Sequence, residues 1–162
     1  MTAMSKKTII VFSGEYDRLM AAFIIANGAA AMDDEVTMFF TFWGLSALRK
    51  DGKPAAVEKK TSTLQKMFGG MLPKNAEKMP LSKFNFAGAG RGMMKKVMKD
   101  ENVMTVAELI ETAQEQGIKM IACTMSMDVL GIAKEELIDG IEYAGVATYL
   151  GEADESNVNL FI

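Results

Sequence analysis

The chain has 162 residues, 49% of them hydrophobic, with a formal net charge of −3 at pH 7. This length is typical of one domain that buries its own core without disulfides or metals. The absence of histidine excludes an imidazole base, a histidine-activated nucleophile and an imidazole metal ligand. The single cysteine, Cys123, excludes an internal disulfide, a CxxC redox motif and a thiolate zinc cluster.

Charge is distributed unevenly along the chain. Between Arg49 and Lys99 there are 13 basic and 3 acidic residues, a net charge of +10, whereas the other residues are 5 basic and 18 acidic, a net charge of −13. Such a basic segment favours an anionic ligand, an acidic partner or pairing between subunits, or is a solvated lysine-rich excursion. The longest apolar stretch, Leu19 to Met32, is shorter than the ~20 residues of a membrane span. We therefore expect a cytoplasmic protein that neither spans a membrane nor binds nucleic acid.

The N-terminal segment predicts a strand, a helix and a second strand. Thr8 to Phe12 is an apolar strand pattern, Ser13-Gly14 predicts a turn, and acidic residues indicate a helix start near Glu15 to Asp17. The apolar residues expected to face inward from that helix are Leu19, Met20, Phe23, Ile24, Ala26 and Ala30. Val36 to Phe42 predicts the second strand, with Trp43 and Gly44 at its exit. This succession predicts two parallel strands joined by a right-handed crossover.

A basic, methionine-rich excursion is expected at about residues 45 to 104. Residues 49 to 60 have the composition of a mobile loop, and residues 61 to 71 predict a short helix. Its expected inward side chains are Leu64, Met67, Phe68 and Met71. A glycine-rich stretch, GAGRG at 88 to 92, precedes a basic helix that reaches about Lys99. The methionines suit core filling, an adaptable partner-docking face or, through their thioethers, copper(I) binding.

The second half contains the clearest helix. Thr105 and Glu108 form a capping box at its start, and Gly117 ends it. Its expected buried stripe is Val106, Leu109, Ile110 and Ala113. A strand ending at Cys123 follows, then a turn or short helix at 135 to 137 and an extended piece at 141 to 143. A helix is expected at 145 to 155 and a closing strand at 158 to 162. The helix has Val146, Tyr149, Leu150 and Ala153 on one face. The pattern predicts a single three-layer α/β/α domain with a mainly parallel five-stranded sheet.

Cys123 is the sharpest candidate for chemistry. In a parallel α/β sheet, ligands bind beyond the carboxyl ends of the strands, so Cys123, Ser13-Gly14 and Trp43-Gly44 should converge on one edge. If Thr124, Met125 and Ser126 begin a helix, their N–H groups can stabilise a thiolate. The alternative is that Cys123 is a small buried hydrophobe.

The GAGRG stretch is a second, weaker candidate. Gly90, Arg91 and Lys95 could form an anion-binding site at the start of the basic helix. The sequence matches neither GxGxxG nor GxxxxGK[ST], so a hinge or lid is the favoured interpretation.

Several segments resemble the DsrE/DsrF-like family of sulfur-relay proteins. They are SGEYDRLMAAFIIANGAAAM, VTMFFTFWGL, GAGRGMMKKVMKD, IKMIACTMSMDVLGIAKEELIDGIEYAGVATYL and NVNLFI, which cover nearly the whole chain. The chain is most similar to the methionine-rich branch described as peroxiredoxin-like or sulfurtransferase-like. The resemblance implies the three-layer fold with five parallel strands, homo-oligomers such as trimers or hexamers, and a persulfide-carrying cysteine at Cys123.

The leading hypothesis is a sulfur carrier or sulfurtransferase. Cys123 would take a sulfane sulfur from a persulfide and pass it to the thiol of a partner, without a metal or organic cofactor. Ser13, Gly14, Trp43 and Gly44 would wall its pocket, and the basic segment would act as lid or docking surface. Two alternatives remain: a non-catalytic module that binds a nucleotide or another anion, and an oligomeric scaffold.

Overall fold

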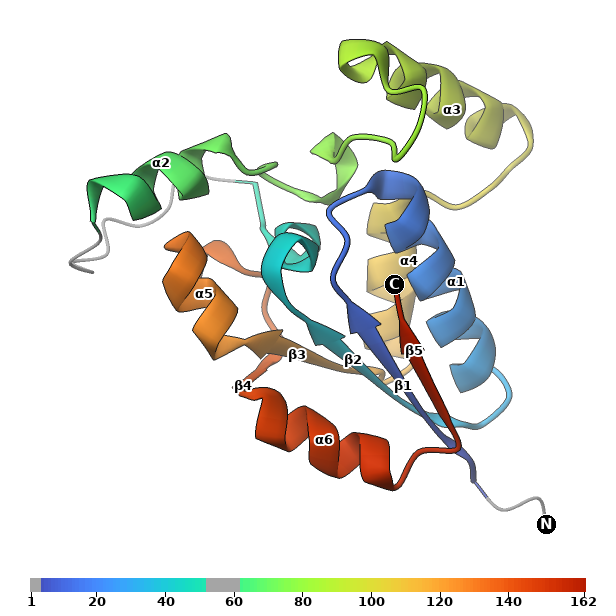
Figure 1. The fold of residues 1–162 in the computed structure, drawn as a ribbon. Coiled ribbons are helices and arrows are strands. Elements are labelled where there is room, and N and C mark those ends of the chain that lie inside the picture. Colours follow the sequence, from blue (N-terminus) through green and yellow to red (C-terminus); the bar gives the residue numbers. More distant parts are fainter. Residues whose placement is uncertain (1–3, 52–61) are drawn as a thin grey trace.

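A five-stranded parallel sheet forms the centre of the molecule (Figure 1). The computed structural model describes residues 4–51 and 62–162. Its strands are β1 (Lys6–Val11), β2 (Glu35–Phe40), β3 (Lys119–Cys123), β4 (Glu142–Ala144) and β5 (Val158–Phe161), in the order β4-β3-β2-β1-β5. All four neighbouring pairs are parallel. The predicted α/β class and the five strands are confirmed.

Helices cover the two faces of the sheet. Helices α1 (Tyr16–Ala30) and α4 (Val106–Glu115) pack side by side on one face, while α6 (Val146–Asp154) lies on the other (Figure 1). The short helix α5 (Thr124–Leu130) follows β3 without a loop, and a 3-10 turn, η4 (Lys134–Glu136), comes before β4. The three-layer arrangement follows from right-handed crossovers between parallel strands.

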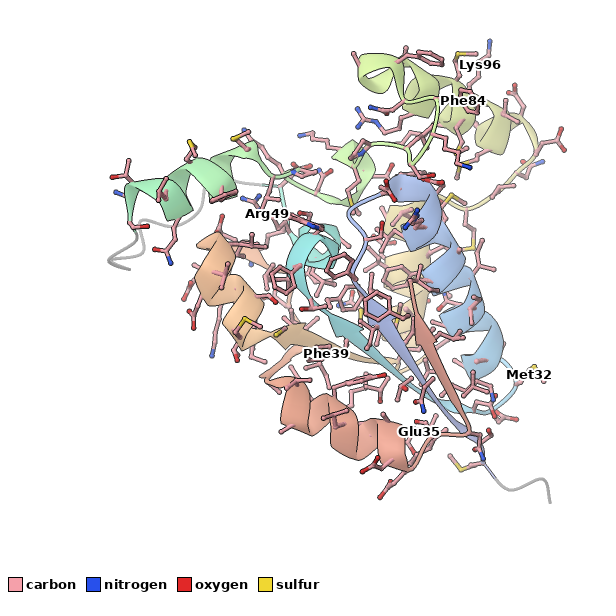
Figure 2. All side chains as sticks on the ribbon, viewed as in Figure 1. Met32, Glu35, Phe39, Arg49, Phe84 and Lys96 are labelled. Carbon is pink, nitrogen blue, oxygen red and sulfur yellow. The ribbon has the colours of Figure 1, made fainter. Side chains whose placement is uncertain are left out.

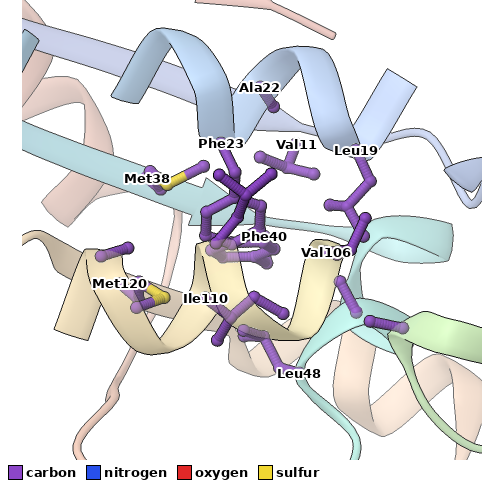
Figure 3. Close-up of a cluster of buried hydrophobic side chains, with 14 of the residues drawn as sticks. Val11, Leu19, Ala22, Phe23, Met38, Phe40, Leu48, Val106, Ile110 and Met120 are labelled. Carbon is purple, nitrogen blue, oxygen red and sulfur yellow. The ribbon is translucent and has the colours of Figure 1, made fainter. Parts of the chain in front are cut away.

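The main core lies between the sheet and the α1/α4 layer. Phe23 of α1 and Phe40 of β2 meet at its centre, with ring centroids 6.0 Å apart (Figure 3). Val106, Leu109, Ile110 and Ala113 of α4 are buried there, as the spacing of the helix predicts. The capping box is also confirmed, because the Thr105 side chain accepts from the N–H of Glu108 and the Glu108 carboxylate accepts from the N–H of Thr105.

The expected inward faces of the outer helices are only partly correct. In α1, Leu19, Phe23 and Ala26 are buried, but Ile24 is 52% exposed because it lies on the flank of the 3.6-residue stripe. In α6, Tyr149 is buried while Val146 and Leu150 are exposed. Tyr149 is the residue of α6 that packs in the cluster with Phe39 and Ile121, while Val146 and Leu150 lie outside that cluster.

The segment after β2 begins as part of the core. The 3-10 helix η1 (Phe42–Leu48) buries Leu45, Ala47 and Leu48. The chain then forms α2 (Thr63–Met71), η2 (Ala76–Lys78), η3 (Phe86–Gly88) and α3 (Ala89–Asp100), with α2 and α3 extending to opposite sides above the sheet (Figure 1). Residues 52–61, most of the expected mobile loop, lie outside the described part.

Helix α2 corrects one prediction. Its apolar side chains do not point inward: Leu64, Met67, Phe68 and Met71 are all exposed. The helix is attached by its polar and glycine residues instead, because Gln65 donates to the Asp128 carbonyl and the Arg49 guanidinium donates to the Gly69 carbonyl. Arg49 also pairs with Glu136 at 3.0 Å (Figure 2 labels Arg49 beside α2). The amphipathic pattern of α2 is real, but no residue within 4–51 or 62–162 covers its apolar face.

Candidate functional site

Cys123 is the last residue of β3 and the N-cap of α5. In the register of the sheet it pairs with Ala144 of β4 and lies one residue beyond the pair formed by Phe40 and Ala122. The chain passes from strand to helix at the thiol itself, as the sequence predicts. Because the first N–H groups of a helix have no partner within the helix, the sulfur-bearing residue adjoins the positive end of α5.

The thiol faces the thinly covered side of the sheet. Cys123 is 3% exposed and packs in a small cluster with Phe39, Ile121 and Tyr149. The rings of Phe39 and Tyr149 stack with centroids 5.2 Å apart, between β2 and α6 (Figure 2 labels Phe39). Cys123 is a free cysteine. A reagent can therefore reach the sulfur only if neighbouring side chains move aside.

The residues after Cys123 take three different positions. Thr124 is half-buried, Met125 is 54% exposed and Ser126 is fully buried. The hydroxyl of Ser126 shares a hydrogen bond of 2.8 Å with that of Thr41, which ties α5 to the end of β2. Met125 is therefore the part of this turn that a partner or substrate can touch first.

A separate cavity of about 380 Å³ lies beyond the ends of β1 and β2. Ser13, Gly14 and Trp43, three of the predicted wall residues, line it, whereas Cys123 does not. The remaining lining residues are Phe12, Glu15, Arg18, Ser46, Leu72, Pro73 and Pro80. The structure thus brings the predicted turn residues together, but around this cavity and not around the Cys123 thiol.

Two glycines allow the walls of this cavity to meet. A Cβ on Gly44 would lie 2.0 Å from the Val11 carbonyl oxygen, and a Cβ on Gly14 would lie 2.9 Å from the Cβ of Trp43. Phe42 adopts a positive φ of 46°, which is rare for a bulky residue. Gly44 itself does not line the cavity; it permits η1 to pack against β1 and so places Trp43.

The cavity and the thiol are neighbours on one edge. Strand β2 separates β1 from β3 in the sheet. Two strand spacings amount to about 10 Å, too far for direct contact between the sulfur and a ligand lying at the end of β1. The predicted convergence at the carboxyl edge is observed, but as two centres.

The glycine-rich stretch is used for packing. A Cβ on Gly90 would lie 1.8 Å from the Phe84 carbonyl oxygen, so α3 needs glycine there. Arg91 donates to the carbonyls of Lys78 and Met79, and Lys95 donates to the Glu77 carbonyl. Lys95 also pairs with the Glu77 carboxylate. These contacts hold α3 against η2 and favour a structural role for both cations.

No pattern in the sequence assigns Phe39 to the cluster of the thiol, or Arg18 and Ser46 to the lining of the cavity. Tyr149 and Glu15 do carry a signal, since the sequence places Tyr149 on the inward face of a helix and Glu15 at a helix start. Only the alternation of β2 hints that Phe39 and Phe40 face opposite sides. Within the described ranges there is no cluster of three potential metal-ligating side chains, and no helix there is long and apolar enough to cross a bilayer.

Comparison with protein families identifies the relationship. The model of the DsrE/DsrF/DrsH-like family matches residues 4–161, nearly the whole chain. The chain belongs to this family. The resemblance found in the sequence motifs is therefore confirmed.

Two full-length relatives place the chain within the DsrE/DsrF/DrsH-like family. It is 59% identical to the uncharacterized protein YrkE of Bacillus subtilis over 163 residues, covering 100% of both chains. It is 37% identical to the sulfur carrier protein DsrE2 of Allochromatium vinosum over 157 residues, covering 97% of this chain and 98% of that protein.

Solved structures share the fold at low sequence identity. The ychN protein of E. coli superposes with a TM-score of 0.61 at 13% identity, covering 98% of this chain and 100% of that chain. MTH1491 of Methanobacterium thermoautotrophicum, a protein of unknown function, gives 0.57 at 10% identity, with coverage of 96% and 98%. These two likenesses support the fold alone.

Proposed function

We propose that this protein is a sulfur carrier that holds a persulfide on Cys123. The observation that carries the proposal is the position of the only thiol, at the carboxyl end of β3 and the start of α5. Relatedness to a protein named as a sulfur carrier supports the same role. A lone cysteine suits a carrier, because a relay step needs one thiol from each participant.

The proposed loading step conserves atoms and electrons. The Cys123 thiolate attacks the outer sulfur of a donor R–S–SH, the donor S–S bond breaks, and the donor leaves as R–S⁻ while Cys123 becomes Cys–S–SH. In the unloading step an acceptor thiolate attacks the outer sulfur and regenerates the Cys123 thiolate. The first N–H groups of α5, at Thr124 to Ser126, adjoin this centre, and helix N-termini favour anionic sulfur.

Burial of the thiol sets a condition on this chemistry. At 3% exposure, Cys123 is protected from bulk solvent. Loading therefore requires displacement of the Phe39 and Tyr149 layer or approach past Met125. Protection suits a carrier, since a persulfide held away from bulk solvent reacts only slowly with small thiols and persists until the acceptor arrives.

The oligomeric state and partners belong to the same proposal. The exposed apolar face of α2 and the basic α3 helix would contact other copies of this chain in a homo-oligomer, a trimer or a hexamer, or a relay partner protein. We place these steps in the cytoplasm, where donor and acceptor thiols are kept reduced.

The test is to measure intact mass after incubation with a sulfane-sulfur donor. Wild-type protein treated with glutathione persulfide or thiosulfate should gain the mass of one sulfur atom and lose it again with dithiothreitol. Cys123→Ser should gain nothing. Wild-type protein that stays unloaded with each donor, including a persulfide-loaded rhodanese, would contradict the proposal.

Because the thiol is buried, access must be measured in the same experiment. Alkylation of Cys123 by N-ethylmaleimide, followed by mass spectrometry in native buffer and in urea, gives the accessible fraction. If the thiol alkylates in native buffer but accepts no sulfur, the failure lies in the chemistry and not in access.

A further inference from the structure

We propose that the cavity beyond the ends of β1 and β2 binds a free α-amino acid with an aromatic side chain. This site is distinct from Cys123, which does not line the cavity. Its occupation does not depend on persulfide chemistry, so it stands independently of the proposed function. Four features of the cavity carry the inference: its place in the sheet, its charged pair, its flat apolar walls and a buried hydroxyl without a partner.

The cavity adjoins β1, the strand at which the strand order reverses. From β1 the chain adds β2, β3 and β4 on one side, then returns through α6 to place β5 on the other side of β1. The crossover helices on the two sides, α1 and α6, lie on opposite faces of the sheet (Figure 1). Open parallel sheets bind ligands beyond the carboxyl ends of their strands, near such a reversal. Phe12 to Glu15, directly after β1, line the cavity, and Trp43 and Ser46, which follow β2, line it on the side away from β5.

The charged pair is complementary to a zwitterion. Arg18 pairs through Nε with Glu15 Oε2 at 2.8 Å, and Ser13 donates to the same Oε2 atom at 2.9 Å. No other described residue bonds to the Arg18 guanidinium. Its outer Nη groups can bind a carboxylate, and Glu15 can accept from an ammonium group. The cavity has one negative and one positive side chain, so a neutral zwitterion fits it better than a simple anion.

Flat apolar surfaces make up most of the remaining wall. The rings of Phe12 and Trp43 and the prolines Pro73 and Pro80 line the cavity with Leu72. Such surfaces favour an aromatic ring, which gains both from burial and from ring contacts. The volume of about 380 Å³ is at the small end of ligand sites and suits a single amino acid.

Ser46 adds a buried hydroxyl to the cavity wall. The residue lines the cavity and is 1% exposed, and its Oγ has no hydrogen-bond partner among the described residues. Buried hydroxyls are normally paired, because leaving one unpaired is unfavourable. Neighbouring atoms cover this Oγ, so a ligand ring with a polar tip would pair with it only after a shift of the wall, and that pairing would favour tyrosine over phenylalanine.

Trp43 makes the proposal directly measurable. It is the only tryptophan in the sequence and is 40% exposed, so a ligand against its ring should change its fluorescence. Titrations of the full chain should use L-tyrosine, L-phenylalanine, tyramine and 3-(4-hydroxyphenyl)propionate, with calorimetry as a second readout. The last two probes lack the carboxylate and the ammonium group, respectively.

The expected result is that L-tyrosine binds, with each truncated probe at least about tenfold weaker, the usual effect of losing a hydrogen bond between charged groups. L-phenylalanine should bind about fivefold more weakly than L-tyrosine, and this preference should disappear in Ser46→Ala. Arg18→Gln should weaken L-tyrosine about tenfold. Lys96→Gln, an exposed change on α3, is the matched control that should leave binding unchanged, as should Cys123→Ser.

Three results would overturn the proposal. One is the absence of any fluorescence or heat change with L-tyrosine up to its solubility. Another is equal affinity for L-tyrosine and both truncated probes, which indicates an unspecific apolar depression. The third is unchanged affinity in Arg18→Gln, which stays interpretable even if Ser46→Ala fails to fold, because Arg18 is an exposed side chain.

Discussion

The two faces of the sheet are covered very differently. On the α1/α4 face, Ile9, Val11, Met38 and Phe40 are at most 1% exposed. On the α6 face, the row that holds Phe39 and Ile121 ends at Phe161, which is 67% exposed. Two helices pack against the first face, whereas α6 contacts β1 and β4 on the second.

The face of the sheet that contributes most to the stability of the fold is not the face that holds the Cys123 thiol. Most of the buried apolar surface, and hence most of the hydrophobic stabilisation, lies on the α1/α4 face. The only thiol in the sequence lies in the smaller cluster, on the α6 face. A protein built in this way can open locally around its cysteine without disturbing the main core.

The largest expected effect on stability is on the face of the sheet that α1 and α4 cover. Phe40→Ala should lower the free energy of unfolding by about 3–5 kcal/mol, because a fully buried ring leaves a cavity between α1 and α4. Phe161→Ala, on the open face, should lower it by less than about 1 kcal/mol. Urea unfolding followed by circular dichroism measures both, and equal losses would show that the two faces contribute alike.

The second largest effect concerns how fast Cys123 is alkylated after a change on each face of the sheet. Tyr149→Ala should lower the free energy of unfolding by about 2 kcal/mol, a typical loss for a buried side chain, and should speed native alkylation of Cys123, because Tyr149 packs in its cluster. Leu109→Ala, on α4, is a control of comparable instability on the opposite face. If both variants speed alkylation equally, global unfolding and not the α6 layer controls access.

A smaller effect is expected at the start of α4. Thr105→Ala removes the side chain that accepts from the Glu108 N–H, and should lower the free energy of unfolding by about 1 kcal/mol. Native alkylation of Cys123 should stay unchanged, because the cap stabilises the other face. Thr112→Ala in the same helix, with a hydroxyl bonded only to the Glu108 carbonyl, is the control for losing a threonine.

The smallest effect is the acid dependence of that cap. The backbone N–H of Thr105, and then its hydroxyl, bond to the Glu108 carboxylate and lower its pKa below the usual 4.5. This contribution to stability is therefore present above pH 4.5 and is lost as the pH falls through the lowered pKa. Thermal unfolding of Glu108→Gln between neutral and acid pH should show a flatter decline than wild type. An identical decline would place the acid sensitivity elsewhere.

The elements were predictable where local pattern and tertiary contact agree. The α4 helix carries its start, its buried stripe and its stop in its own residues, and the strands of the sheet are short apolar runs separated by turn residues. The exposure of Leu64 and Ile24 was not predictable in this way. A helical stripe indicates which side is apolar, but the neighbouring elements determine whether anything packs against it.

In the candidate site, too, some features follow from local sequence pattern and others only from tertiary contacts. By itself, the sequence determined the family motifs, the α/β class, the lone thiol at a strand end and the exclusion of histidine chemistry, because these depend on residue types and local periodicity. Only the tertiary structure decided that the Phe39 and Tyr149 side chains pack in one cluster with Cys123. It also decided that Ser13, Gly14 and Trp43 line a different cavity with Arg18 and Ser46. The physical reason is that strand order and close backbone approaches, as at Gly44 against Val11, bring distant residues together, and no local pattern in the chain encodes them.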